Sequence, residues 1–331
     1  MKLSILDQSP VAQGANARTA IEQTVQLAVQ AEQLGYHRFW VSEHHDAKRV
    51  AGSTPEVLLA HIGAKTNTIR IGSGGVMLPH YSSYKVAENF KMLEALYPNR
   101  MDLGVGRAAG GNPIATMALQ QNSGSREYDR YPEQVFDLQS YFTNLPESHP
   151  YYGITATPEI ETLPELWLLG SSGGSAHIAA ERGTAFTFAH FINGNGGEDV
   201  VKAYRNQFKR SAFYENPVAS VAIHLICAPT DEEANERALS LDLSLLMLQK
   251  GNRSLEIQSI DEAKQYPYTA NDLALINENR KRMIVGSPER VKEQLTLLAN
   301  RYEVEEVMVI TITHEFNHRI ESFELLASMF Q

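Results

Sequence analysis

Cysteine is almost absent from this chain: Cys227 is the only one among its 331 residues. A single thiol cannot form an intrachain disulfide and cannot build a cysteine-rich metal site. Long apolar runs are missing too: no segment approaches the ~18 apolar residues of a membrane-spanning helix, and the apolar stretch at the start is too short for a signal peptide. We therefore expect a cytoplasmic protein that has no membrane partner.

Basic residues are scarce relative to acidic ones. The chain has 29 Lys and Arg against 39 Asp and Glu, for a formal net charge of −10. This balance argues against a nucleic-acid partner, which favours a basic face. Hydrophobic residues make up 43% and charged residues 21%, the composition of a globular protein with a substantial core.

Short apolar runs alternate with helical stretches along nearly the whole sequence, as in parallel sheets whose strands are joined by helices. The pattern predicts eight strands, at residues 3–6, 39–41, 69–73, 101–105, 166–169, 185–189, 220–227 and 307–313. Eight such units match a (β/α)8 TIM barrel with insertions after several strands. Because no linker-like stretch divides the chain, we expect a single domain over residues 1–331.

Three segments interrupt this alternation. Residues 108–125 are polar and rich in glycine, residues 148–163 contain prolines, and residues 250–280 are polar. We expect a small hairpin or an irregular loop at 148–163, and 250–280 is the best candidate for a mobile or poorly ordered loop. A helix is expected over residues 128–141. The insertions carry no chemistry that identifies a substrate.

The segment Glu43-His44-His45 follows directly after the expected strand 39–41. Ligands of parallel α/β proteins bind at the carboxyl ends of the strands. A histidine there can act as acid or base, bind a ligand, hold a metal, or have a structural or surface role. Neighbouring side chains of an extended chain point opposite ways, so the two histidines cannot easily share one metal. The residues alone leave these alternatives open.

A loop of small residues, Gly-Ser-Ser-Gly-Gly-Ser at 170–175, lies between an expected strand and an expected helix. Backbone N–H groups at a helix N-terminus, together with hydroxyls, suit an anion. Arg107, at the end of the strand 101–105, offers a charge-assisted clamp for a phosphate. The alternatives are a tight turn for the loop and a salt bridge to a rim carboxylate for Arg107.

Two glycines, Gly74 and Gly75, follow the strand 69–73, and they allow a flat group to approach the backbone. The apolar residues that come next, starting with Val76, suit the back wall of a planar ring. An ordinary core under a loop explains them equally well.

Several segments occur in the order found in one known family: FWVSEHH at 39–45, IRIGSGGVMLP at 69–79, YPNRMDLGVGR at 97–107 and AAERG at 179–183. With them the whole chain resembles the bacterial luciferase-like flavin monooxygenases. The resemblance implies a TIM barrel that binds reduced FMN (FMNH₂) at the strand ends, activates O₂ and oxidises a small organic substrate.

The resemblance also implies roles for single residues. His44 would be the active-site base beside the flavin, and Gly74 and Gly75 would be joined by a cis peptide bond. Val76 and the chain around it would back the isoalloxazine ring. The residues expected to hold the FMN phosphate are Arg107, Ser171, Ser172 and Ser175.

The expected partners follow from the same resemblance: a separate NAD(P)H-dependent flavin reductase as the source of FMNH₂, and a second copy of the chain in a homodimer. No metal is expected. Val105 stands where luciferase subunits carry a reactive cysteine, so we do not expect light emission. Two alternatives stay open. One is a flavin- or deazaflavin-binding protein or dehydrogenase of this fold without oxygen insertion; the other is a metallohydrolase that uses His44 and His80.

Overall fold

Nine strands form one sheet in this computed structural model, which describes residues 1–108, 110–121, 129–252 and 255–330. All pairings between these strands are parallel. The strands are β1 (Lys2–Asp7), β2 (Arg38–Val41), β3 (Arg70–Met77), β4 (Met101–Gly106), β5 (Glu165–Gly170), β6 (Ala185–Ala189), β7 (Ala219–Cys227), β8 (Met283–Gly286) and β9 (Glu306–Ile310).

Eight of these strands close into a ring, because β6 pairs with β7, β7 with β9 and β9 with β1. The ring confirms the predicted (β/α)8 barrel. The short strand β8 was not predicted and stands outside the ring. His224 of β7 pairs with both Ile310 of β9 and Met283 of β8. Strands β6 and β8 therefore pair with the same edge of β7: β6 pairs with its first part, up to Ala222, and β8 pairs with its last part, from His224.

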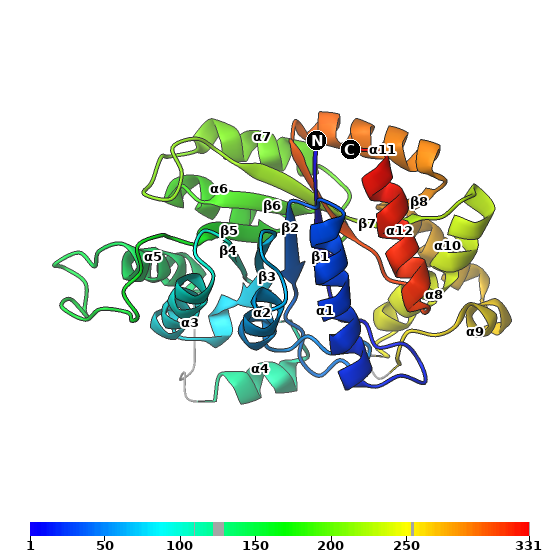
Figure 1. Cartoon of the computed structure of the whole chain (residues 1–331), viewed down its shortest axis with the longest axis horizontal. Coiled ribbons are helices and arrows are strands. Elements are labelled where there is room, and N and C mark those ends of the chain that lie inside the picture. The colour runs from blue at the N-terminus through cyan, green and yellow to red at the C-terminus, as the bar shows by residue number, and fades with distance from the viewer. Residues whose placement is uncertain (109, 122–128, 253–254, 331) are drawn as a thin grey trace.

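Helices surround the barrel (Figure 1), and both chain ends lie close together at one side of it. Helix α4 lies at the opposite side, where the strands end. Within the described ranges, no helix has the length and hydrophobicity that crossing a membrane requires. The helices are α1 (Ala17–Gln33), α2 (Pro55–Gly63), η1 (Leu78–His80), α3 (Ser83–Leu96), α4 (Pro113–Leu119), α5 (Tyr131–Phe142), α6 (Gly173–Arg182), α7 (Gly197–Gln207), α8 (Asp231–Gln249), α9 (Ile260–Gln265), α10 (Ala270–Arg280), α11 (Pro288–Tyr302) and α12 (Phe316–Ser328).

Apolar side chains pack on both faces of the sheet, as the alternation of strand residues requires. In β7, Val221 and Ile223 belong to the core between the sheet and the helices. Ala222, which lies between them, packs with the interior cluster that contains Trp40 and Trp167. The two indole rings meet edge to face with their centroids 5.4 Å apart. The barrel interior is thus a packed core up to the level of the strand ends.

Buried and partly buried charges close the barrel at the end where the strands begin. Arg38, the first residue of β2, donates from Nη1 to Asp102 Oδ2 at 2.8 Å and from Nε to Glu306 Oε1 at 2.7 Å. Arg70, the first residue of β3, donates from Nε to Asp102 Oδ1 at 2.9 Å. Glu165 of β5 accepts from Arg38 at 3.1 Å. We call these five residues the basal ion network.

The segment 250–280, expected to be a mobile or poorly ordered loop, contains the helices α9 and α10 instead. Each begins with a capping box, in which the side chain of one residue and the backbone of another satisfy each other's hydrogen-bonding groups. The pairs are Ser259 with Glu262 and Thr269 with Asp272. The capping residues can be recognised in the sequence. The two helices were not predicted because the segment as a whole is polar.

A further expectation needs correction. Strand β3 does not stop before Gly74 but runs on to Met77, with a shift in its pairing to β4 between Gly74 and Val76. The segment 108–125 contains helix α4. The predicted helix 128–141 corresponds to α5, and position 128 lies outside the described residues.

Candidate active site

A cavity of about 410 Å³ opens at the carboxyl ends of the strands, and seven of the eight predicted site residues line it. Val76 is the exception: its side chain is fully buried in the core between the sheet and the helices. Its neighbours Gly75 and Met77 face the cavity, as strand alternation requires. The lining residues that were predicted are His44, Gly74, Gly75, Arg107, Ser171, Ser172 and Ser175.

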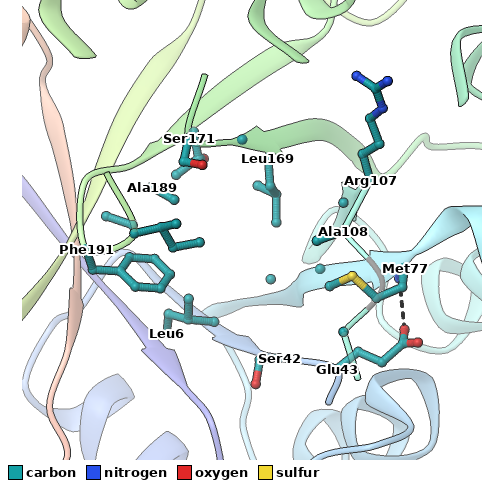
Figure 2. A pocket seen from close by; sticks show the side chains of 18 of the residues that line it. Leu6, Ser42, Glu43, Met77, Arg107, Ala108, Leu169, Ser171, Ala189 and Phe191 are labelled. Carbon is teal, nitrogen blue, oxygen red and sulfur yellow. Dashed lines mark hydrogen bonds between the residues drawn. The ribbon is translucent and has the colours of Figure 1, made fainter. Parts of the chain in front are cut away.

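The floor of the cavity is apolar. Leu6 and Leu169 reach into it from β1 and β5 (Figure 2), and Trp40 also lines it. A Cβ atom on Gly74 would lie 2.6 Å from Cδ1 of Leu6, so this wall of the cavity must be bare backbone. The peptide bond between Gly74 and Gly75 is cis, as the resemblance implied. Bare backbone beside an apolar floor suits a flat, mostly apolar ring.

Arg107 and the first turn of α6 meet at the rim of the cavity. A Cβ atom on Gly174 would lie 3.4 Å from Nη1 of Arg107, so the guanidinium group lies against that turn. Ser172, the residue before the helix, is exposed and makes no capping hydrogen bond with its side chain. Ser175 is buried in the same turn. A positive charge, hydroxyls and helix N–H groups thus converge on one place, which is the composition of an anion site.

Arg107 also forms the salt bridge that was its alternative interpretation. Its guanidinium group pairs with the carboxylate of Asp129, and the side chains are 47% and 42% exposed. Exposed pairs of this kind contribute about 0–1 kcal/mol. A doubly charged anion at the turn of α6 can therefore compete with Asp129 for the guanidinium group.

His44 lies half-buried at the cavity, directly after β2. Its Nδ1 is 3.0 Å from Oγ of Ser42, and its backbone N–H donates to the carbonyl of Gly52 at 2.8 Å. Burial lowers the pKa of His44 to about 4, and the nearby charges of Arg49 and His45 act in the same direction. The imidazole is therefore neutral at pH 7 and able to accept a proton.

Glu43, for which the sequence predicted no role, is a buried carboxylate in the cavity wall. Its Oε2 accepts the backbone N–H of Met77 at 3.0 Å, the contact drawn as a dashed line in Figure 2. Its Oε1 accepts the Tyr81 hydroxyl at 2.7 Å and lies 2.7 Å from Nε2 of His45. Glu43 thereby ties the end of β2 to the end of β3. Its position beside His44 at a strand end was the available signal.

Gln8, Phe191 and Ile192 also line the cavity without having been predicted. Gln8 follows β1 directly, and Phe191 and Ile192 follow β6. The signal they share is again position, because each stands within a few residues of the carboxyl end of a strand. Residue type alone did not distinguish them from ordinary loop and core residues.

A metal site finds little support in the parts of the chain that are described, where no group of three or more His, Cys, Asp or Glu side chains is placed to hold an ion. His80, proposed with His44 in the metal alternative, has its Nδ1 3.0 Å from Nε2 of Gln120. Its ring meets that of His45 edge to face, with the centroids 6.0 Å apart.

Comparison with known proteins adds to this geometry. The sequence profile of a family described as luciferase-like monooxygenase matches residues 1–302. The chain belongs to the luciferase-like monooxygenase family. Two relatives from Bacillus subtilis (strain 168) resemble this luciferase-like chain over almost their full length. One is YwcH, 53% identical over 100% of this chain and 99% of its own length. The other is named N-acetyl-S-alkylcysteine monooxygenase and is 38% identical over 99% of this chain and 97% of its own length.

Solved structures carry the same fold as this luciferase-like protein. The apo form of MsnO8 superposes with a TM-score of 0.90 at 35% identity, covering 99% of this chain and 97% of that chain. A type II Baeyer-Villiger monooxygenase in complex with FMN, the oxygenating constituent of 3,6-diketocamphane monooxygenase from Pseudomonas putida, superposes with a TM-score of 0.73 at 21% identity, covering 99% and 97%. At 21% identity, the likeness to the Baeyer-Villiger monooxygenase shows a shared fold only.

Proposed function

We propose that this protein is an FMN-dependent monooxygenase that receives FMNH₂ from a separate NAD(P)H-dependent flavin reductase and uses O₂ to oxidise a small organic substrate. The observation that carries the proposal is the meeting of Arg107 with the first turn of α6 beside a cavity with an apolar floor. When bound, reduced FMN supplies the electrons that activate O₂. Family membership and the FMN in a structure of the same fold support this function.

The rim residues fit the phosphate of FMN. Arg107 supplies the charge, and the hydroxyls of Ser171, Ser172 and Ser175 supply hydrogen bonds together with the N–H groups of α6. Gly170 keeps this place open, because a Cβ atom there would lie 2.9 Å from Oγ of Ser175.

The flavin ring would then lie against Gly74 and Gly75, over Leu6 and Leu169. These residues offer backbone and hydrocarbon, which admit a flat ring and keep water from it. Met77 covers the neighbouring wall, and Glu43 holds its backbone N–H. The chain therefore contributes orientation and exclusion of water at this place.

His44 would move protons for the reaction. Its Nδ1 is held near Ser42, which leaves Nε2 for a reacting group. Because burial lowers the pKa of His44 to about 4, the ring is unprotonated throughout the neutral range. An imidazole of such low pKa is a weak base, so His44 would accept a hydrogen bond from the reacting group and hold its proton only transiently.

We further propose a homodimer formed through α2 and α3. Val57 of α2 and Met92 and Leu96 of α3 are 71%, 53% and 54% exposed. They border a groove of about 700 Å³ between the two helices. Exposed apolar side chains gathered around one groove are typical of an interaction surface.

Titration with FMN and with riboflavin, followed by flavin fluorescence, tests the cofactor site. Riboflavin lacks the phosphate, so FMN should bind at least about tenfold more tightly, and Arg107→Gln should remove most of that preference. Arg18→Gln, on the exposed face of α1, is the matched control and should change neither affinity. Equal affinity of the wild-type protein for FMN and riboflavin would contradict the assignment.

A second measurement separates the proposed monooxygenase from the alternative without oxygen insertion. The FMNH₂-loaded protein is mixed with O₂ and candidate substrates, and oxygen incorporation is followed by mass spectrometry with ¹⁸O₂. Incorporated label supports the monooxygenase. Tight flavin or deazaflavin binding with substrate oxidation that needs no O₂ would favour the dehydrogenase.

A further inference from the structure

The side of the cavity across from the phosphate cradle carries a polar side chain that the proposed function does not use. In the ring of eight strands, β1 is the fourth neighbour of β5 in either direction, so the ends of these two strands face each other across the barrel mouth. Gln8 follows β1, lines the cavity and is only 7% exposed. Its side-chain amide faces the cavity and makes no hydrogen bond with the described part of the chain, so both its donor and its acceptor are left for a ligand.

The loop that carries Gln8 is held firmly on both sides. The carboxylate of Asp7 accepts the backbone N–H of Ser9 at 2.7 Å and the hydroxyl of Thr24 at 2.7 Å. Nη1 of the buried Arg319 lies 3.5 Å from the other oxygen of Asp7. Ser9 itself has a φ of 51°, a conformation that residues other than glycine adopt rarely. The loop therefore cannot rearrange easily to give Gln8 a partner from the protein.

The surroundings of Gln8 define what a partner would look like. A primary amide offers both a donor and an acceptor, and so matches a ligand that carries an amide of its own. Arg49 is buried and donates from Nη1 to Oγ of Ser244 at 3.4 Å, and its charge lies near enough to His44 to lower the pKa of that histidine. Phe191 lies near Leu6 on the same side (Figure 2) and supplies an apolar wall.

We propose that Gln8 recognises the acyl-amide group of the substrate, and that the substrate is an N-acylated amino acid with an apolar thioether side chain. This inference rests on the proposed function. The amide would pair with Gln8, and the thioether would pack near Phe191. The name of one Bacillus subtilis relative, N-acetyl-S-alkylcysteine monooxygenase, describes a substrate of this chemistry.

The test uses calorimetric binding to the FMN-loaded protein. The probes are N-acetyl-S-ethylcysteine and 3-(ethylthio)propanoic acid, a thioether acid that lacks the acyl amide. A site built to pair an amide rejects an analogue without it, so the wild-type protein should bind the first probe at least about tenfold more tightly. Gln8→Leu should reduce this preference to less than about threefold and leave the FMN affinity unchanged. Gln33→Leu, at the exposed end of α1, is the matched control and should keep the full preference.

Three results would overturn the inference. Equal binding of the two probes by the wild-type protein, or no binding of either, would remove the substrate class. A Gln8→Leu variant that loses FMN affinity would place Gln8 at the flavin instead. The first result needs no variant, so the inference stays open to refutation even if Gln8→Leu does not fold. Failure of FMN itself to bind would refute the proposed function, whereas intact FMN binding with equal probe affinities refutes this inference alone.

Discussion

Neutralising Asp102 should destabilise the barrel strongly, because this fully buried carboxylate is the centre of the basal ion network. The change Asp102→Asn keeps the shape of the side chain but replaces one acceptor oxygen with an NH₂ group. Both oxygens now accept N–H donors, from Arg38 and Trp40 on one side and from Arg70 on the other, at 2.5–2.9 Å. The new NH₂ group would therefore face a donor in either orientation.

The expected loss of unfolding free energy depends on the partners that Arg38 and Arg70 keep after Asp102 is neutralised. Removing one partner of a buried ion pair costs about 3–5 kcal/mol, because the other charge stays buried. Arg38 keeps Glu306 at 2.7 Å and Glu165 at 3.1 Å, and the Arg70 side chain is 19% exposed to water. These compensations place the expected loss of unfolding free energy near the lower end, about 3 kcal/mol.

Urea unfolding followed by circular dichroism measures this loss. The matched control is Glu236→Gln, which neutralises a carboxylate in the exposed pair with Lys264 and should cost less than about 1 kcal/mol. The double variant Asp102→Asn/Arg38→Met should lose less than the sum of the two single changes, because one unpaired charge is removed. If Asp102→Asn costs no more than Glu236→Gln, the reasoning is wrong.

Two further predictions concern pH and assembly. Burial lowers the pKa of His224 to about 4, so the unfolded chain binds its proton near pH 6.5 and the folded chain does not; stability should fall as the pH falls from 6.5 toward 4. Between pH 7 and pH 5, His224 should account for a loss of about 2 kcal/mol in the free energy of unfolding. The urea midpoints at these two pH values should therefore differ less in His224→Gln than in the wild-type protein. An unchanged difference would contradict the lowered pKa of His224. Met92→Glu should yield monomers in sedimentation if α2 and α3 form the dimer interface, whereas Met117→Glu, at the still more exposed Met of α4 (72% against 53%), should not. Dimers of both variants would exclude this face.

The barrel could be predicted from the sequence because its signals are local. Each buried strand of a parallel sheet is a short apolar run, and helices with an apolar face separate the runs. Strand β8 escaped because it is four residues long and follows the polar segment 250–280. In that segment the capping boxes at Ser259 and Thr269 were a better guide to helices than composition.

The candidate site could be predicted in outline, since strand ends converge at one edge of a parallel barrel. His44 and Arg107, which were predicted from their positions at strand ends, both line the cavity. The side chain of Val76 lies in the core between the sheet and the helices, because strand alternation turns it away from the cavity. The roles of Glu43 and Gln8 depend on partners that the sequence does not place: the N–H of Met77 for one, and the lack of a protein partner among the described residues for the other.

The basal ion network and the ligand cavity lie at opposite ends of the same strands. Arg38 alone reaches carboxylates on β4, β5 and β9, so the ring is fastened by side chains that never approach the rim. Loops above the strands can therefore vary in length and content while the fastening stays the same. For protein engineering, this means that the rim loops can be exchanged to accept a different substrate while the barrel itself is left unchanged.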